Sequence, residues 1–127
     1  MSDGAIVGIA HVQVAAPAGC EPQARAFYGD ALGLPELAKP DALAARGGCW
    51  FACGDRQLHV GVAEPFAPAT KAHPALLVRD ASAFAAVVAR LEAKGFPTRR
   101  EVALPGLQRA FVDDPFGNRV ELVTQPR

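Results

Sequence analysis

Hydrophobic and polar residues alternate with a period of two along several short segments of the chain, the pattern of strands with one buried face. In LHVGV (58–62) the leucine and valines share one face, while His59 points to the other. Gly54 and Asp55 predict a tight hairpin turn just before it, and a PFG tripeptide predicts another turn near the C-terminus. We expect strands over 6–15, 49–53, 56–62, 73–79, 97–102, 107–114 and 118–123.

Two segments have helical periodicity instead. Residues 21–32 carry a proline in the first turn and are followed by Gly33, a common pair of start and stop signals. Residues 81–95 follow Asp80, and either this aspartate or Ser82 can cap the helix, which ends at a glycine. Between the first helix and the second predicted strand the pattern is unclear, and we expect at most a short edge strand there.

The order of predicted elements occurs twice, which indicates an internal duplication. Each half begins with a strand, continues with a helix that ends in Gly-x-Pro, and finishes with further strands. Three pairs of landmarks are each separated by 62 residues: Gly33 and Gly95, His11 and His73, and His59 and Glu121. We therefore predict one α+β domain over 1–127, with β-α-β-β-β modules at 5–62 and 73–125 and a linker at 63–72.

Composition removes several classes of function. The 127 residues are 50% hydrophobic and 20% charged, with 13 basic and 13 acidic side chains, which is typical of a globular protein. There is no basic stripe for nucleic acid, no run of membrane-spanning length and no charged start typical of a signal peptide. We expect a cytoplasmic protein with no membrane or nucleic-acid partner. The odd number of cysteines, three, predicts reduced thiols.

Four polar residues interrupt the hydrophobic pattern of the strands: His11, His59, His73 and Glu121. One histidine in a strand is ordinarily a core residue that bonds to a backbone carbonyl, but four such groups would need four separate partners. Three imidazoles and a carboxylate are ligands for a divalent ion, namely zinc, nickel, cobalt, manganese or iron. We expect each polar face to be a cup, and the two cups to bring these ligands together. Gln57 shares the face of His59 and could be the fourth ligand instead.

The chain resembles the vicinal oxygen chelate superfamily, which includes glyoxalases, bleomycin-resistance proteins and dioxygenases. The resemblance runs from about residue 6 to residue 123 and rests on IAHVQV, FYGDALGLP, HPALLV and above all DDPFGNRVELV. It implies paired modules that form a curled eight-stranded mixed sheet, with helices on the outer face and a metal inside. It also implies that His11, His73 and Glu121 are metal ligands and that the fourth, variable ligand is His59 or Gln57.

Other residues are candidates for contact with a substrate. Arg109 and Phe111 share one face of a strand, and Arg109 could anchor an anionic group. Trp50 and Phe51 are adjacent, so only one of them can face the cavity while the other packs in the core. Tyr28 is interpreted as a packing residue. The two aspartates before the PFG turn are expected to form hydrogen bonds within that turn.

Three functions remain as hypotheses. The first is a metal-dependent lyase or isomerase of glyoxalase type, which chelates a small oxygen-rich substrate and in which Glu121 is also the shuttling base. The second is a metal-free drug-binding protein of bleomycin-resistance type, for which the 7% aromatic content offers few stacking walls. The third is an iron-dependent extradiol-type dioxygenase, if only His11, His73 and Glu121 bind the metal.

The resemblance also implies differences from its best-known members. Glyoxalase I has a glutamate where His59 stands, and the fosfomycin-resistance transferases have a tyrosine where Phe111 is expected to lie. Members of the superfamily pair their modules within one chain or exchange them across a dimer. We expect a homodimer, in which His11 and His73 of one chain need not meet.

Overall fold

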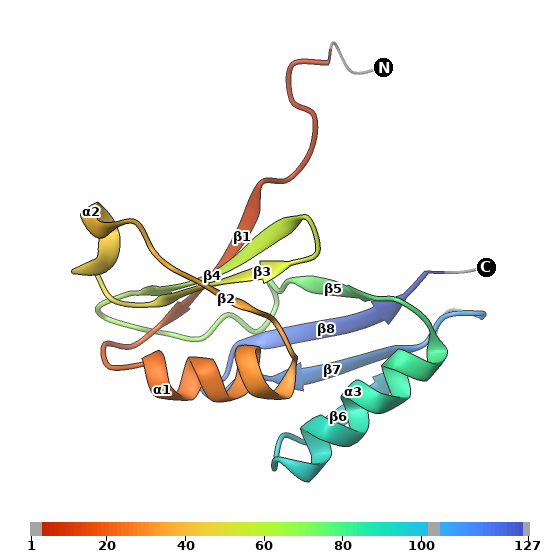
Figure 1. The fold of residues 1–127 in the computed structure, drawn as a ribbon. Coiled ribbons are helices and arrows are strands. Elements are labelled where there is room, and N and C mark those ends of the chain that lie inside the picture. The colour runs from red at the N-terminus through yellow and green to blue at the C-terminus, as the bar shows by residue number, and fades with distance from the viewer. Residues whose placement is uncertain (1–3, 102–104, 126–127) are drawn as a thin grey trace.

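The computed structural model describes residues 4–101 and 105–125. It contains two β-α-β-β-β modules, and the predicted α+β fold class is therefore confirmed (Figure 1). The first module comprises β1 (His11–Ala16), α1 (Glu21–Ala24), η1 (Arg25–Ala31), β2 (Glu36–Leu37), α2 (Asp41–Ala44), β3 (Cys49–Cys53) and β4 (Arg56–Val62). The second comprises β5 (Ala75–Val78), α3 (Ala81–Ala93), β6 (Thr98–Glu101), β7 (Arg109–Asp113) and β8 (Arg119–Thr124).

The strands form two four-stranded mixed sheets, ordered β1-β4-β3-β2 and β5-β8-β7-β6. In each sheet the first strand of the module pairs in parallel with the last, and the remaining pairs are antiparallel. The parallel pairs have equivalent registers, because Gln13 lies opposite His59 and Ala75 lies opposite Glu121, and 75 − 13 = 121 − 59 = 62. Each residue pair in the β1–β4 register therefore has an equivalent pair in the β5–β8 register 62 residues later, the same offset as in the sequence repeat.

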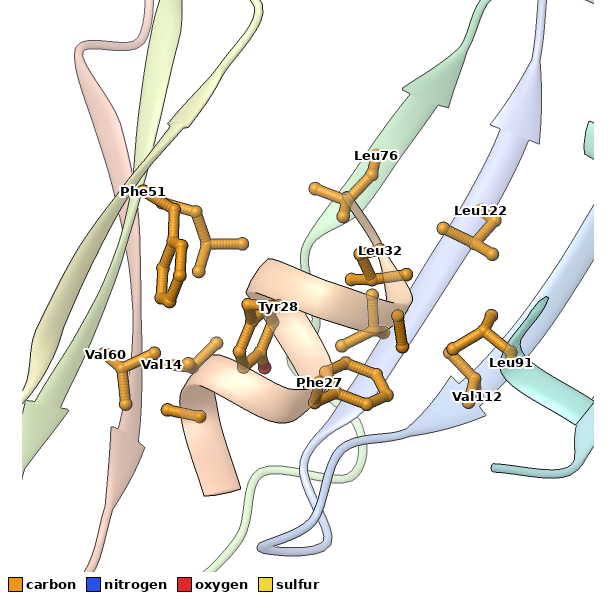
Figure 2. Close-up of a cluster of buried hydrophobic side chains, with 14 of the residues drawn as sticks. Val14, Phe27, Tyr28, Leu32, Phe51, Val60, Leu76, Leu91, Val112 and Leu122 are labelled. Carbon is orange, nitrogen blue, oxygen red and sulfur yellow. The ribbon is translucent and has the colours of Figure 1, made fainter. Parts of the chain in front are cut away.

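The hydrophobic core lies between the two sheets and is centred on η1, a π-helical continuation of α1. Figure 2 shows η1 with Val14, Phe51 and Val60 of the first sheet on one side, and Leu76, Val112 and Leu122 of the second on the other. Phe27 and Tyr28 on η1 are fully buried between them. Leu91 brings α3 into the same cluster. Since both sheets turn their apolar faces to this core, their polar faces point away from each other.

A hydrogen-bond network ties the two modules together. Asp114 accepts backbone bonds from Phe116 and Asn118 at 2.9 and 2.8 Å, which confirms its expected role in the turn between β7 and β8. Asn118 in turn donates to the backbone carbonyl of Ala15 in β1 and accepts from the backbone of Ala69, both at 2.8–2.9 Å. The turn of the second module is therefore anchored to the first strand and to the linker.

The strand predicted over 6–15 is partly wrong, because β1 begins at His11. His11 lies opposite Gln57, near the start of β4, so residues before His11 have no neighbouring strand in this chain. The segment instead extends away from both sheets (Figure 1), and Ile6, Val7 and Ile9 are 85%, 88% and 72% exposed. An alternating pattern marks a segment that can form a strand, but a strand also needs a partner for its backbone groups.

The other predicted elements are present and differ from expectation at their ends. The short edge strand is β2, and α2, which follows it, was not predicted. Asp80 caps α3, where its Oδ1 accepts a 2.8 Å bond from the backbone N–H of Ala83. Of the strand predicted at 97–102, the last residue lies outside the described residues. No helix within the described parts of the chain is long and apolar enough to cross a membrane.

Candidate functional site

The polar face of the first sheet carries a stack of three rings, which come from β1, β3 and β4. Trp50 lies opposite His59 in the strand register, and their rings are parallel to within 2° with centroids 4.0 Å apart. His11 stacks on the other side of His59, at 4.2 Å and 17°. The alternation of β3 therefore directs Trp50 to the polar face, whereas Phe51 is fully buried in the core.

Gln57 determines the tautomer of His59. The Nε2 of His59 donates a 2.8 Å hydrogen bond to the amide oxygen of Gln57, which can only accept. This leaves the lone pair of Nδ1 as the metal-binding position of the ring. His59 is 6% exposed, and its pKa is lowered, first by burial and then by the neighbouring charges of His11 and Lys39. The low pKa favours the neutral imidazole, which is the form that binds metals.

The polar face of the second sheet holds a compact pair, His73 and Glu121. The Nε2 of His73 lies 2.8 Å from Oε1 of Glu121, and its Nδ1 donates to the backbone carbonyl of Lys71 at 2.8 Å. A carbonyl partner on Nδ1 is the usual arrangement of a metal-binding histidine, because it leaves the lone pair on Nε2. Two ligand atoms at metal-bond distances of about 2.1 Å and a right angle lie about 3 Å apart. The pair therefore fits a shared divalent ion in both chemistry and spacing.

Arg109 holds the other oxygen of Glu121. Its Nε donates to Oε2 at 2.8 Å, and its Nη2 lies 3.5 Å from Oε1. The pKa of Glu121 is lowered, mainly by the hydrogen bond from Arg109, while burial acts in the opposite direction and His73 adds to the lowering. A carboxylate held in this way is a weaker base than a free one. The proton chemistry of Glu121 therefore depends on where the guanidinium of Arg109 lies.

Phe111 lies beside this pair and is covered by two arginines. It faces Glu121 in the strand register, and its ring meets that of His73 edge to face at 5.5 Å. The guanidinium carbons of Arg109 and Arg119 lie 4.9 and 5.3 Å from its centroid. Arg119 was missed in the sequence, although it precedes Glu121 by two residues in β8 and so shares its face.

The structure brings the four proposed ligands together as two pairs and not as one cluster. His11 and His59 belong to the first sheet, and His73 and Glu121 to the second. Among the described residues, no group of three or more histidine, cysteine or acidic side chains could hold a metal ion. Our expectation that the two polar faces converge is therefore not met within one chain, because η1 separates the sheets and their polar faces point apart.

His11 and His73 nevertheless share the wall of one pocket, of about 650 Å³, at the edges of β1 and β5. Apolar side chains form most of this wall, including Ile9, Leu76 and Leu77. His11 and His73 are exposed, in contrast to the buried His59 and Glu121. The two buried residues, His59 and Glu121, each have a hydrogen-bond partner within the protein. The sequence argument that these polar groups would lack partners without a metal therefore does not hold.

Comparison with known proteins places this chain in a family. The family model described as the glyoxalase/bleomycin resistance protein/dioxygenase superfamily matches residues 8–122. The chain belongs to this superfamily. No curated protein matches its sequence.

Several solved structures of the superfamily have the same fold. A protein from Bacillus anthracis assigned to the glyoxalase family is 47% identical, with a TM-score of 0.88 over 94% of this chain and 96% of that one. Lactoylglutathione lyase from Agrobacterium tumefaciens is 22% identical, with a TM-score of 0.73 over 94% and 95% of the two chains. The fosfomycin resistance protein FosX from Listeria monocytogenes is 14% identical, with a TM-score of 0.73 over 96% and 94%. The last two likenesses concern the fold alone.

Proposed function

We propose that this superfamily member is a metal-dependent lyase or isomerase of glyoxalase type that acts on a small oxygen-rich substrate. The divalent ion (zinc, nickel, cobalt, manganese or iron) would be held by His11, His59, His73 and Glu121, with Gln57 as the alternative to His59. The observation that carries the proposal is the geometry of His73. Its Nδ1 is committed to a backbone carbonyl, while its Nε2 and Oε1 of Glu121 lie 2.8 Å apart, the spacing of two ligands of one ion.

The complete site would form in a homodimer, where the first sheet of one chain faces the second sheet of its partner. Three features of the chain support this. The polar faces of its own sheets point apart, β1 and β5 are edge strands, and apolar residues beside them are exposed. Ile6, Val7, Ile9 and Leu77 are between 60% and 88% exposed, which is unusual for side chains of this kind.

Each side chain of the site would have a distinct task in this reaction. A bound divalent ion would supply a Lewis acid that stabilises negative charge on the two substrate oxygens. Glu121 would carry the proton between neighbouring carbon atoms of the substrate, and Arg109 would control its basicity through their hydrogen bond. Trp50 and Phe111 would form apolar walls on the two half-sites. Gln57 would orient the ring of His59.

A metal-free binding protein is the second candidate, and one observation favours it. Arg109 already satisfies Oε2 of Glu121, and a His73 ring with protons on both nitrogens would donate to Oε1, so the carboxylate has partners without an ion. Trp50, on the polar face of the first sheet, would then stack on a planar drug. A dioxygenase that uses only His11, His73 and Glu121 would be recognised by oxygen uptake in the presence of ferrous iron and a catechol.

The metal content of the purified chain tests the proposal. We expect close to one ion per chain in the wild type, and little in His73→Ala or Glu121→Gln. Glu36→Gln is the matched control, because Glu36 is also a strand glutamate paired with an arginine, Arg25, at 2.9 Å, but lies outside the site. A chain without metal after exposure to nickel, zinc, cobalt, manganese and ferrous iron would overturn the enzyme proposal and leave the binding protein.

The three free cysteines agree with a cytoplasmic location, which we propose as well.

A further inference from the structure

A further pocket, which we call the α2 pocket, lies on the polar face of the first sheet and has a volume of about 230 Å³. Its wall combines three residues of the sheet with three of the segment between β2 and β3: Gln13, Trp50 and Gly61, and Lys39, Leu43 and Arg46. Gln13 and Trp50 both lie opposite His59 in the strand registers. Gly61 follows His59 by two positions in β4, so the three sheet residues share its face. None of the four proposed metal ligands lines this pocket.

The segment that forms the other half of the wall is longer than its counterpart in the second module. Residues 38–48 connect β2 to β3 and 102–108 connect β6 to β7, so the connections have 11 and seven residues. No side chain of α2 is buried, and the backbone hydrogen bonds of 40–47 stay within the segment. Figure 1 shows α2 at the outer end of the first sheet, away from the second sheet. A segment with so few contacts to the sheet can move as a lid over the pocket.

The lid brings two positive charges to the pocket, on Lys39 and Arg46. Among the described residues, no carboxylate lies within 4.0 Å of either charged group. The Nζ of Lys39 donates to the backbone carbonyl of Gly47, which closes the base of the lid. An ammonium group has three donors, so two remain for a ligand.

The acidic side chains near the lid lie outside the α2 pocket. Glu36 is paired with Arg25 at 2.9 Å. Glu21 and Glu64 line a separate hollow that Arg46 also borders, and Oε2 of Glu21 accepts a bond from a backbone N–H at 2.6 Å. None of the described acidic side chains lines the α2 pocket itself. An anionic ligand in this pocket would therefore meet two positive side chains and no negative one.

The sheet side of the pocket adds a neutral donor and an apolar wall. The side chain of Gln13 lies across Gly61, where a Cβ atom would be 2.5 Å from Nε2, so this position of Gln13 requires a glycine. Within the described parts of the chain, the amide of Gln13 has no hydrogen-bond partner and is available to a ligand. Trp50 and Leu43 supply the apolar part of the wall. A pocket of drug-molecule size measures about 300–1,000 Å³, so this one suits a single ring and its substituent.

We propose that the α2 pocket binds a small carboxylic acid with a planar apolar body, and that residues 38–48 close over it as a lid. Lys39 and Arg46 would hold the carboxylate, and Gln13 would donate to one of its oxygens. The planar body would lie between Leu43 and Trp50. The inference goes beyond the proposed function and does not depend on it, because it uses no metal ion and only residues of one chain.

Titration with benzoate tests this, because Trp50 is the single tryptophan and its fluorescence reports on the pocket. A chelator is present throughout, and benzamide is the neutral analogue. We expect a saturable change in the wild type and binding at least about fivefold weaker in Lys39→Gln and in Arg46→Gln, since each loses a charge-assisted hydrogen bond. Benzamide should bind at least about tenfold more weakly than benzoate. Lys94→Gln is the control, because it removes one positive charge from an exposed residue far along the chain, and it should leave the affinity unchanged.

Arg46→Gln separates the charge of the lid from its closure, since only Lys39 makes the bond to Gly47. Equal affinities of the wild type, Lys39→Gln and Arg46→Gln for benzoate would place its binding elsewhere and overturn the inference. Benzamide that binds as tightly as benzoate, or benzoate without a saturable response, would do the same. Amide hydrogen exchange tests the lid: benzoate should slow exchange over 40–47 in the wild type, and an unchanged rate there would show that the segment does not close.

Discussion

The hydroxyl of Tyr28 donates a 2.7 Å hydrogen bond to Oδ2 of Asp114, across 86 residues of sequence. Tyr28 lies on η1 of the first module, and Asp114 lies in the turn that precedes β8 of the second. Both side chains are buried, and Asn118 donates to the same oxygen at 3.0 Å. This bond therefore connects the helix at the centre of the core to the turn that positions Glu121.

Removal of that hydroxyl tests its contribution to stability. We expect Tyr28→Phe to lower the free energy of unfolding by about 1–3 kcal/mol, because a buried acceptor loses one of its donors. Denaturant unfolding, followed through the fluorescence of the single tryptophan, measures the change. The double variant Tyr28→Phe with Asp114→Asn should cost less than the sum of the two single changes. Strict additivity would indicate that the two side chains do not interact.

Tyr28 is also the only tyrosine of the chain, so its ionisation can be followed directly. Burial, and then the charge and hydrogen bond of Asp114, raise its pKa well above the usual value of about 10. A raised pKa stabilises the folded state below the usual pKa, and this stabilisation is lost as the pH rises above it. We expect the absorbance of tyrosinate to stay absent above about pH 10 until the protein unfolds. Reversible ionisation of the folded protein near pH 10 would contradict the assignment.

Alanine substitutions at two glycines with positive φ distinguish the loss of stability caused by backbone strain from the loss caused by a steric clash. Gly48, at φ +87°, precedes β3, and a Cβ atom there would meet the carbonyl group of Val60. Gly54, at φ +59°, lies in the β3–β4 turn, where a Cβ atom would meet nothing within 4 Å. Gly54→Ala should cost about 1–2 kcal/mol for the left-handed conformation alone. Gly48→Ala should cost clearly more, because β4 must also shift beside His59; equal melting temperatures would contradict this.

The exposed apolar residues at the edges of β1 and β5 make the proposed homodimer testable. Leu77→Glu should shift the protein towards a monomer in light scattering, because it places a charge on an edge that is apolar and 60% exposed. The same variant should lose metal, although it leaves all four proposed ligands in place. Ala85→Glu, which adds the same charge to an exposed position of α3, is the control. A dimeric Leu77→Glu protein, or a wild type that is monomeric and still binds one metal ion, would contradict a site shared between chains.

The elements of the fold could be predicted from the sequence because they depend on local periodicity. Period-two alternation located the central strands, and the repeat of 62 residues reappears as identical registers of the β1–β4 and β5–β8 pairs. Where prediction failed, the reason was tertiary. Residues 6–10 have the pattern of a strand but no neighbour to pair with, and the two-residue strand β2 is too short to have a pattern.

For the site, the sequence determined which residues lie on the polar faces, because in a strand the side-chain direction follows from position alone. It therefore placed His59, Arg109, Phe111 and Glu121 on the ligand-bearing faces, and it left open which of Trp50 and Phe51 joins them. Only the tertiary structure decided how these faces relate to each other. Burial of η1 on both sheets at once turns the polar faces apart, and no local pattern encodes that choice. Hydrogen-bond partners were decided in the same way, because whether Glu121 meets a metal, His73 or Arg109 depends on distances in space between β7, β8 and the segment before β5.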